Sequence, residues 1–205
     1  YFVVTNSNSK YADDALDAGT KLISPRQAIE ILGLKERIKI IGITGTNGKT
    51  TTAFLLAHTL SNLGYKCAIS GTCGSFADGR QIAKKGLTTS QILETLSYIK
   101  EAVECDCKYF IMEVSSHAIA QNRIEGLEFA LKIFTNLSQD HLDFHKSFDE
   151  YARVKSSFLS DSSDKIINCD DKNISYNALN ALTYSLKSGN IIASNFELKD
   201  GIIAT

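Results

Sequence analysis

One glycine-rich segment has the residues needed to bind a phosphate group. An apolar run at 40–43 leads into TGTNGKTT at 44–51. Glycines let successive backbone N–H groups point at one anion, and the start of a following helix adds positive potential. Lys49 can reach the outer phosphates, and Thr50 can coordinate Mg²⁺. Ile43 stands at the first glycine of the strict motif, but the strand and helix on either side favour a phosphate loop over a chance GKT turn. The predicted nucleotide contacts are Gly45, Thr46, Asn47, Gly48, Lys49, Thr50 and Thr51.

The phosphate loop alone does not select a nucleotide. GTP-binding proteins carry an NKxD tetrapeptide that reads guanine, and this chain contains none. ATP is therefore the expected nucleotide.

A carboxylate ends the apolar run at 109–113. Glu113 occupies the carboxyl end of this predicted strand, the edge where open α/β sheets bind ligands. It is a candidate Mg²⁺ ligand, with a solvated strand-end glutamate as the alternative. The next segment, 114–123, is rich in hydroxyl, amide, imidazole and guanidinium groups, which suits a polyanionic substrate.

Two further features have both a chemical and a structural interpretation. Residues 140–145 hold two Asp and two His, which could bind a metal, although a capped turn explains them nearly as well and the spacing fits no closed zinc site. Lys155 lies on an otherwise apolar helical stripe. Its ammonium either extends to water along a buried stem or has properties altered by burial.

The elements that must position these residues alternate between short apolar runs and helical periodicity. This pattern predicts an α/β fold, a mainly parallel phosphate-loop sheet with flanking helices. The predicted strands are 38–43, 67–70, 109–114, 129–134, 165–168 and 183–186. The predicted helices are 49–63 with Gly64 after its end, 91–104 with Thr89 or Ser90 as cap, and one that starts from the capping-box pattern at Ser147.

The first residues differ from the rest. Residues 1–36 combine a strand at 2–4, a polar turn and short helices at 12–18 and 25–32, and we interpret them as the remnant of a separate small α/β domain. Residues 37–205 then form the nucleotide-binding domain. The first residue is not Met, and the last residues read as an unfinished strand after the Asp200-Gly201 turn, so we expect a fragment of a longer protein.

Composition limits the class of protein. The 205 residues include 22 basic and 23 acidic side chains, a net charge of −1, so we expect neither a nucleic-acid nor a membrane partner. The five cysteines show no paired CxxC spacing, which is typical of reduced thiols in a cytoplasmic protein. No apolar run is long enough to span a bilayer. The sequence does not indicate the oligomeric state, and a monomer is the default expectation.

Three segments taken together resemble the Mur ligase family. They are GTNGKTT at 45–51, MEVSSH at 112–117 and TNLSQDHLDFH at 135–145, which occur in the family's order between residues 38 and 160. EVSSH followed by Gln121 and Arg123 is similar to the branch that adds the third peptide residue to the peptidoglycan precursor. Residues 1–36 resemble the end of that family's N-terminal UDP-binding domain.

The resemblance implies an ATP-dependent ligase with small-molecule substrates, a UDP-linked muramoyl dipeptide and an amino acid, either meso-diaminopimelate or L-lysine. The D-glutamyl carboxylate would attack the γ-phosphate of ATP, and the amine would then displace phosphate from the acyl phosphate. The family's C-terminal ligase domain is absent, so the isolated fragment should be inactive. The alternatives are a folylpolyglutamate synthase-like ligase and a noncatalytic nucleotide-binding module.

Position by position, the resemblance also implies roles. Two Mg²⁺ ions are expected, and Lys155 resembles a carbamylated lysine that binds metal. Ser90 stands where the family commonly has Pro, and Asn136 matches a family residue whose role we leave open. The implied catalytic residues are Lys49, His141 and Lys155, the metal ligands Thr50, Glu113, His141 and Lys155, and the substrate contacts Thr88, Thr89, Ser115, Gln121 and Arg123.

Overall fold

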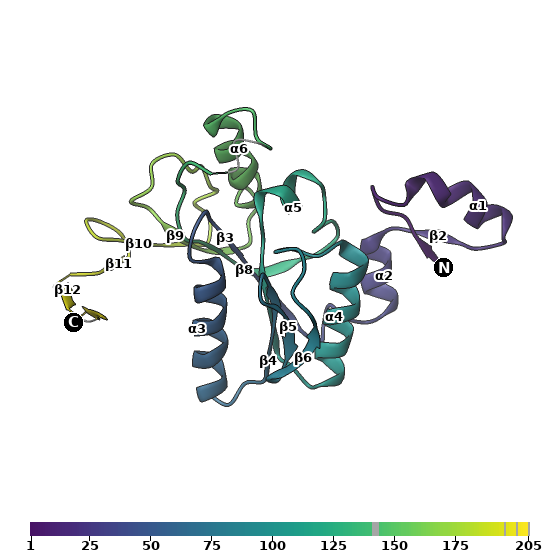
Figure 1. Cartoon of the computed structure of the whole chain (residues 1–205), viewed down its shortest axis with the longest axis horizontal. Coiled ribbons are helices and arrows are strands. Elements are labelled where there is room, and N and C mark those ends of the chain that lie inside the picture. The colour runs from purple at the N-terminus through teal and green to yellow at the C-terminus, as the bar shows by residue number, and fades with distance from the viewer. Residues whose placement is uncertain (141–143, 195, 200, 205) are drawn as a thin grey trace.

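A computed structural model describes residues 1–140, 144–194, 196–199 and 201–204. Figure 1 shows a twisted sheet seen nearly edge-on, with helices on both faces. In the described part of the chain, the main sheet has the strand order β11-β10-β9-β8-β3-β7-β4-β5-β6, and its strands from β11 to β4 pair in parallel. The predicted α/β fold with a mainly parallel sheet is confirmed.

The centre of the sheet is β3, Lys39–Thr44, which lies between β7, Tyr109–Glu113, and β8, Phe129–Phe134. Each predicted strand is present within a few residues of its expected bounds. The remaining parallel strands are β4 (Cys67–Gly71), β9 (Asp164–Asn168), β10 (Ala181–Ser185) and the short β11 (Ile191–Ile192).

The sequence analysis missed an antiparallel hairpin at one edge of the sheet. After β4 the chain turns back through β5, Gly74–Ala77, and β6, Arg80–Ala83. Asp78 and Gly79 both have positive φ, at 49° and 79°, so the Asp-Gly dipeptide forms the kind of tight turn that hairpins favour. That dipeptide is the signal from which the hairpin could have been found.

Alternation along the strands gives the sheet two apolar faces. On β7, Ile111 faces the side covered by α3, Lys49–Asn62, whereas Phe110 and Met112 face the side covered by α4, Ile92–Glu104. This period of two is what a strand buried on both faces requires. The two helices lie on opposite sides of the sheet in Figure 1.

Helix ends explain where two of these elements start. Helix α4 begins after Gln91, not after the predicted Thr89 or Ser90 cap, because the Thr89 hydroxyl is used elsewhere, on the main chain beyond β7. Helix α6, Phe148–Phe158, starts as predicted, with Ser147 Oγ accepting from the N–H of Glu150 at 3.1 Å. The Glu150 carboxylate accepts from the N–H of Lys146, one residue before the cap, so the capping box is only half formed.

The first residues pair with each other. Strand β1, Phe2–Val3, pairs in parallel with β2, Leu22–Ile23, in a separate sheet. Between them lie η1 (Ser9–Tyr11) and α1 (Ala12–Asp17), and α2 (Pro25–Ile31) follows. A small apolar cluster, Ile23, Ala28, Ile92 and Leu96, packs this segment against α4.

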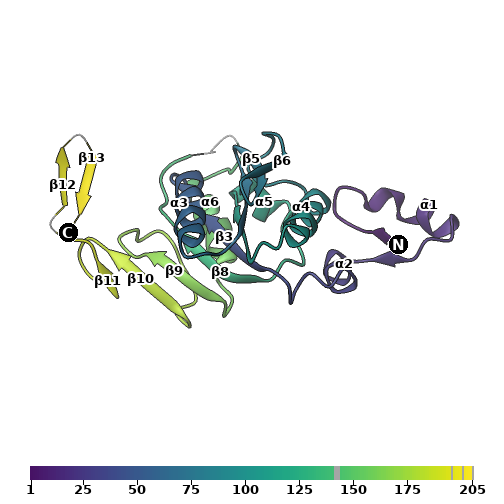
Figure 2. The same ribbon diagram turned by 90° about the horizontal axis from the view of Figure 1, so that it is seen from below.

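Viewed from below, the segments follow one another along the molecule (Figure 2). The N-terminal segment lies at one end, and the hairpin of β12 (Phe196–Lys199) and β13 (Gly201–Ala204) lies at the other, beyond β11. Of the helices in the described ranges, none has the length and apolar character to cross a membrane.

Candidate functional site

The phosphate loop joins β3 to α3 at the carboxyl edge of the sheet, as the sequence predicts. Lys49 is the first residue of α3, and its ammonium donates to the carbonyls of Gly45 at 2.8 Å and Thr46 at 2.9 Å. The side chain therefore folds back over the loop, where a phosphate would meet it. Burial lowers the pKa of Lys49, while the carboxylates of Glu113 and Asp140 act in the opposite direction.

The segment after β8 packs against the phosphate loop and forms hydrogen bonds with it. A Cβ on Gly45, where φ is +145°, would lie 1.9 Å from Thr135 Oγ1, so only glycine fits this position. Thr135 Oγ1 donates to the carbonyl of Asn47 at 2.7 Å. The Asn136 side chain accepts from the Asn47 N–H and donates to the Asn47 carbonyl, both at 3.0 Å. Asn136 thus holds the loop backbone, a role that the sequence did not assign.

Glu113 is buried at the end of β7 and accepts hydrogen bonds from two sides. Thr50 Oγ1 donates to Oε1 at 2.9 Å, and Thr72, in the turn between β4 and β5, donates to Oε1 from its N–H at 2.9 Å. The Thr72 hydroxyl lies 3.1 Å from Oε2. A Cβ on Gly71 would lie 2.1 Å from Oε1, so glycine keeps room for the carboxylate. Thr72 and Gly71 are functional candidates that the sequence analysis missed.

The oxygen atoms of Glu113 and Thr50 are suitable ligands for a hard divalent cation. A carboxylate and a threonine hydroxyl are the oxygen ligands that Mg²⁺ uses when substrate phosphates and water complete its coordination. Within the described ranges, no three His, Cys, Asp or Glu side chains gather into a metal cluster. His141, the other predicted ligand, lies outside the described residues.

Lys155 lies inside the protein, on α6, with only 1% of its surface exposed. The interpretation of a buried stem with a solvated head is wrong, because Nζ donates to the carbonyl of Gly45 at 2.9 Å. Lys49 donates to the same carbonyl, so two cations converge on one acceptor. Burial, with a smaller contribution from the nearby Lys49 charge, lowers the pKa of Lys155 to about 7.

A second contact joins α6 to the phosphate loop. The buried Tyr151 hydroxyl lies 3.0 Å from Thr46 Oγ1. Thr46 Oγ1 also accepts from the N–H of Ser138 at 3.0 Å. Tyr151 and Lys155, one helical turn apart, therefore bring α6 against the loop.

The predicted substrate contacts form a connected group beside Glu113. The Thr89 hydroxyl donates to the Glu113 carbonyl at 2.8 Å and accepts from the Ser115 N–H at 3.0 Å. Arg123 donates to the Thr89 carbonyl at 3.1 Å and to the Gln121 side chain at 3.0 Å. Thr88 Oγ1 lies 3.2 Å from the Thr72 hydroxyl. All five predicted residues, Thr88, Thr89, Ser115, Gln121 and Arg123, lie in this group.

A hollow of about 170 Å³ adjoins this group. Its lining combines Gln121 and Arg123 with the polar turn Thr5, Asn6 and Ser7 from the N-terminal segment. Hydroxyl, amide and guanidinium groups face the hollow from both parts of the chain. No sequence pattern pointed to the turn at 5–7 as part of the site.

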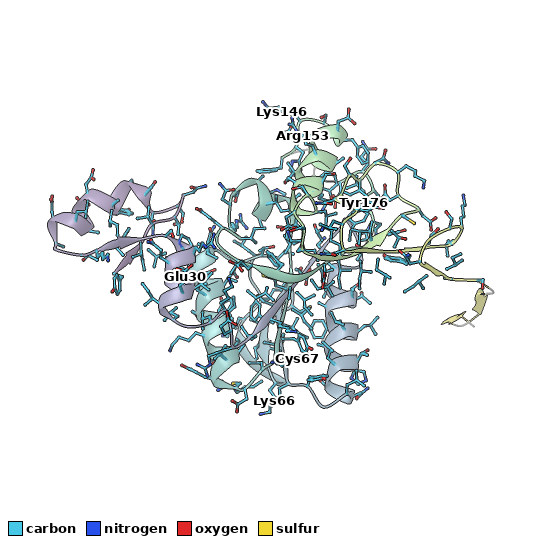
Figure 3. All side chains as sticks on the ribbon, turned by 180° about the vertical axis from the view of Figure 1, so that it is seen from behind. Glu30, Lys66, Cys67, Lys146, Arg153 and Tyr176 are labelled. Carbon is cyan, nitrogen blue, oxygen red and sulfur yellow. The ribbon has the colours of Figure 1, made fainter. Side chains whose placement is uncertain are left out.

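The histidine-rich segment has a structural role at its described end. His145 is buried, and its Nε2 lies 2.9 Å from Ser116 Oγ at the start of α5, Ser116–Ala120. The rings of His117 and Phe144 are in contact, with their centres 4.0 Å apart and their planes tilted by 35°. Asp143 lies outside the described residues. Cys67 and Lys66 lie at the opposite end of the sheet from Lys146 and Arg153 of the α6 region (Figure 3).

Comparison with known proteins places the chain in a family. The sequence model of the family called Mur ligase middle domain matches residues 43–202. The chain belongs to the Mur ligase family. The match covers the three segments on which the resemblance in the sequence rested, at 45–51, 112–117 and 135–145.

Curated relatives extend the match to the first residues. The UDP-N-acetylmuramoyl-L-alanyl-D-glutamate--2,6-diaminopimelate ligase of Helicobacter pylori is 46% identical over 205 residues, which is 100% of this chain and 45% of that protein. The ligase of the same name from Wolinella succinogenes is 47% identical over 91% of this chain and 43% of its own length. The chain thus spans less than half the length of these relatives.

Solved structures agree on the fold. A UDP-N-acetylmuramoyl-L-alanyl-D-glutamate--2,6-diaminopimelate ligase superposes with a TM-score of 0.72 at 25% identity, over 87% of this chain and 41% of that one. A bifunctional folylpolyglutamate synthase/dihydrofolate synthase, solved with Mn, AMPPNP and L-glutamate, gives a TM-score of 0.60 at 17% identity, over 78% and 46% of the two chains. The second likeness is one of fold alone.

Proposed function

We propose that the chain is the nucleotide-binding part of an ATP-dependent ligase that joins 2,6-diaminopimelate to UDP-N-acetylmuramoyl-L-alanyl-D-glutamate in peptidoglycan synthesis. The observation that carries the proposal is the 46% identity over the whole chain to a ligase of that name. The identity covers the phosphate loop, Glu113 and the connected substrate group. L-lysine as the added amino acid is the alternative, and the relatives' names favour diaminopimelate.

The nucleotide is held by groups that suit phosphoryl transfer. The Lys49 ammonium and the N–H groups at the start of α3 would neutralise the charge that spreads over the transferred phosphoryl group. To meet ATP, Lys49 gives up its contacts with the carbonyls of Gly45 and Thr46. The substrate carboxylate would attack the γ-phosphorus and release ADP, and the amine would then attack the acyl carbon and release phosphate.

Glu113 and Thr50 would hold Mg²⁺. The ion would supply charge neutralisation between the nucleotide oxygens, which lowers the cost of bringing a second anion, the carboxylate, to the phosphate. The chain's own contribution is the buried carboxylate that Thr72 and Thr50 orient. A second ion and the participation of His141 belong to the same proposal.

Carbamylation of Lys155 is supported by its surroundings. With a pKa near 7, a large fraction of the amine is neutral at physiological pH, and a neutral amine can add to CO₂ with loss of one proton. The carbamate would replace a cation beside Lys49 with an anion. The repulsion between the two lysines would become an attraction, and a hard oxygen ligand would face the nucleotide.

The UDP-linked substrate would bind beside Glu113. Arg123 is suited to a phosphate or carboxylate, and the hydroxyls of Thr88 and Ser115 add donors for further oxygens. The buried Thr89 hydroxyl, which donates to the Glu113 carbonyl and accepts from the Ser115 N–H, would position Ser115. The hollow between these residues and the turn at 5–7 would accept the nucleotide end of that substrate. Residues 1–36 as the remnant of a UDP-binding domain and 37–205 as the central nucleotide-binding domain complete the proposal. We propose a cytoplasmic monomer.

The alternatives differ in their products. A folylpolyglutamate synthase-like ligase shares the fold, but that likeness is at 17% identity. A noncatalytic nucleotide-binding module would release no amide. The test is ADP release by the complete protein with the UDP-linked dipeptide and, in turn, diaminopimelate, L-lysine, L-glutamate or no amino acid. Release only with diaminopimelate, together with a tripeptide mass, is the expected result; release that ignores the dipeptide would contradict the proposal.

A further inference from the structure

Thr72 lies in a turn with no predicted function, yet it contacts both Glu113 and Thr88, one of the proposed substrate contacts. It lies between β4 and β5, half-buried, and its N–H and hydroxyl reach the two different oxygens of the Glu113 carboxylate at 2.9 and 3.1 Å. The same hydroxyl lies 3.2 Å from Thr88 Oγ1. The hydrogen-bonded series Thr88, Thr72, Glu113 and Thr50 therefore runs from the substrate group to the phosphate loop.

A hydroxyl has one proton to donate and can accept through its lone pairs. The Thr72 proton therefore serves either Glu113 Oε2 or Thr88 Oγ1, but not both at once. With the substrate group empty, the carboxylate is the stronger acceptor because it is charged. When Thr88 donates its own proton to an anionic substrate, its oxygen becomes a good acceptor for Thr72.

We propose that Thr72 is a positioning residue that couples substrate binding at Thr88 to cation binding at Glu113. Rotation of the Thr72 hydroxyl toward Thr88 frees a lone pair on Oε2 for a divalent cation. Binding of the substrate anion thus strengthens cation binding, and linkage requires the reverse as well. The inference rests on the proposed function, because it takes Thr88 as a substrate contact and Glu113 as a metal ligand.

The coupling is measured by titrating the complete protein with Mn²⁺ and following free Mn²⁺ by electron paramagnetic resonance, with and without the UDP-linked muramoyl dipeptide. We expect the dipeptide to raise the Mn²⁺ affinity of the wild type about five- to tenfold, within the usual range of coupling between sites. In Thr72→Val the ratio should fall to about one, because the backbone N–H remains but the switchable proton is lost. Thr72→Ser, which keeps the hydroxyl, should restore the ratio.

Thr95→Val is the matched control. Thr95 on α4 is buried, and its hydroxyl has no hydrogen-bond partner in the described part of the chain. This variant should keep the wild-type ratio. Unchanged coupling in Thr72→Val, or a wild-type ratio of one with dipeptide bound, would overturn the inference and leave the ligase proposal standing. A wild type that binds no dipeptide would contradict the ligase proposal too.

Discussion

At the scale of single residues, the site buries positively and negatively charged side chains close to one another. Lys49 and Lys155 both donate to the Gly45 carbonyl. The buried Glu113 carboxylate lies beside the start of α3, where it accepts from Thr50. Charges buried at this depth interact far more strongly than charges on the surface. We therefore expect the substitution of each of these side chains to change ligand binding or the free energy of unfolding.

Glu113→Gln should weaken Mg²⁺ binding by about tenfold or more, because the amide keeps the shape of the side chain but removes its charge. The amide can still accept from Thr50 and Thr72, so the fold should persist. Dependence of ligation rate on Mg²⁺ concentration measures the effect. Superimposable titration curves for variant and wild type would show that Glu113 is only the end of a strand.

Lys155 should make the stability of the chain depend on pH. The unfolded amine keeps an ordinary pKa of 10.5 and the folded one has about 7, so between these values the unfolded state binds more protons. The free energy of unfolding should therefore rise from pH 7 to 10 relative to Lys155→Met, by an amount on the order of a few kcal/mol. Denaturant titrations in CO₂-free buffer measure it. A difference that stays flat across this window would mean that Lys155 is solvated in the folded state.

At the scale of the elements, the loop after β8 fixes the shape of the phosphate loop. Gly45→Ala should abolish nucleotide binding, because the new Cβ would collide with Thr135 Oγ1 and Asn136. Gly64→Ala is the control: φ there is +85°, but the space around it is open and it lies at the far end of α3. Titration with a fluorescent ATP analogue separates the two. Equal affinities in both variants would show that the close approach at Gly45 is dispensable.

The sequence predicted those parts of the site that depend on local pattern. The phosphate loop, the strand that ends in Glu113 and the helix that carries Lys155 follow from periodicity and turn chemistry. The partners of these residues do not, because Gly45 and Lys155 are 110 positions apart, and only the strand order brings them together. Thr72 was missed for the same reason: its turn reaches Glu113 only after β4 has paired with β7.

At the scale of the whole molecule, the chain holds the proposed nucleotide and substrate contacts but spans only 45% of its relative's length. We predict that the 205 residues bind ATP with Mg²⁺ but form little or no amide when every substrate is supplied. This part of the protein alone would not exclude water from the transferred phosphate. Calorimetry measures binding, and mass spectrometry measures product. Amide formation at the rate of the complete protein would contradict the fragment interpretation.

The central claim is that the site transfers a phosphoryl group from ATP to the substrate carboxylate before the amide forms. The direct test supplies the complete protein with UDP-linked dipeptide labelled with ¹⁸O in both glutamyl carboxylates, together with ATP and diaminopimelate, and measures the released phosphate by mass spectrometry. The attacking carboxylate oxygen leaves with phosphate, so we predict one ¹⁸O in each phosphate released by the wild type and no phosphate release by the Lys49→Ala variant, which should form no product. Unlabelled phosphate released alongside the amide by the wild type would contradict the account.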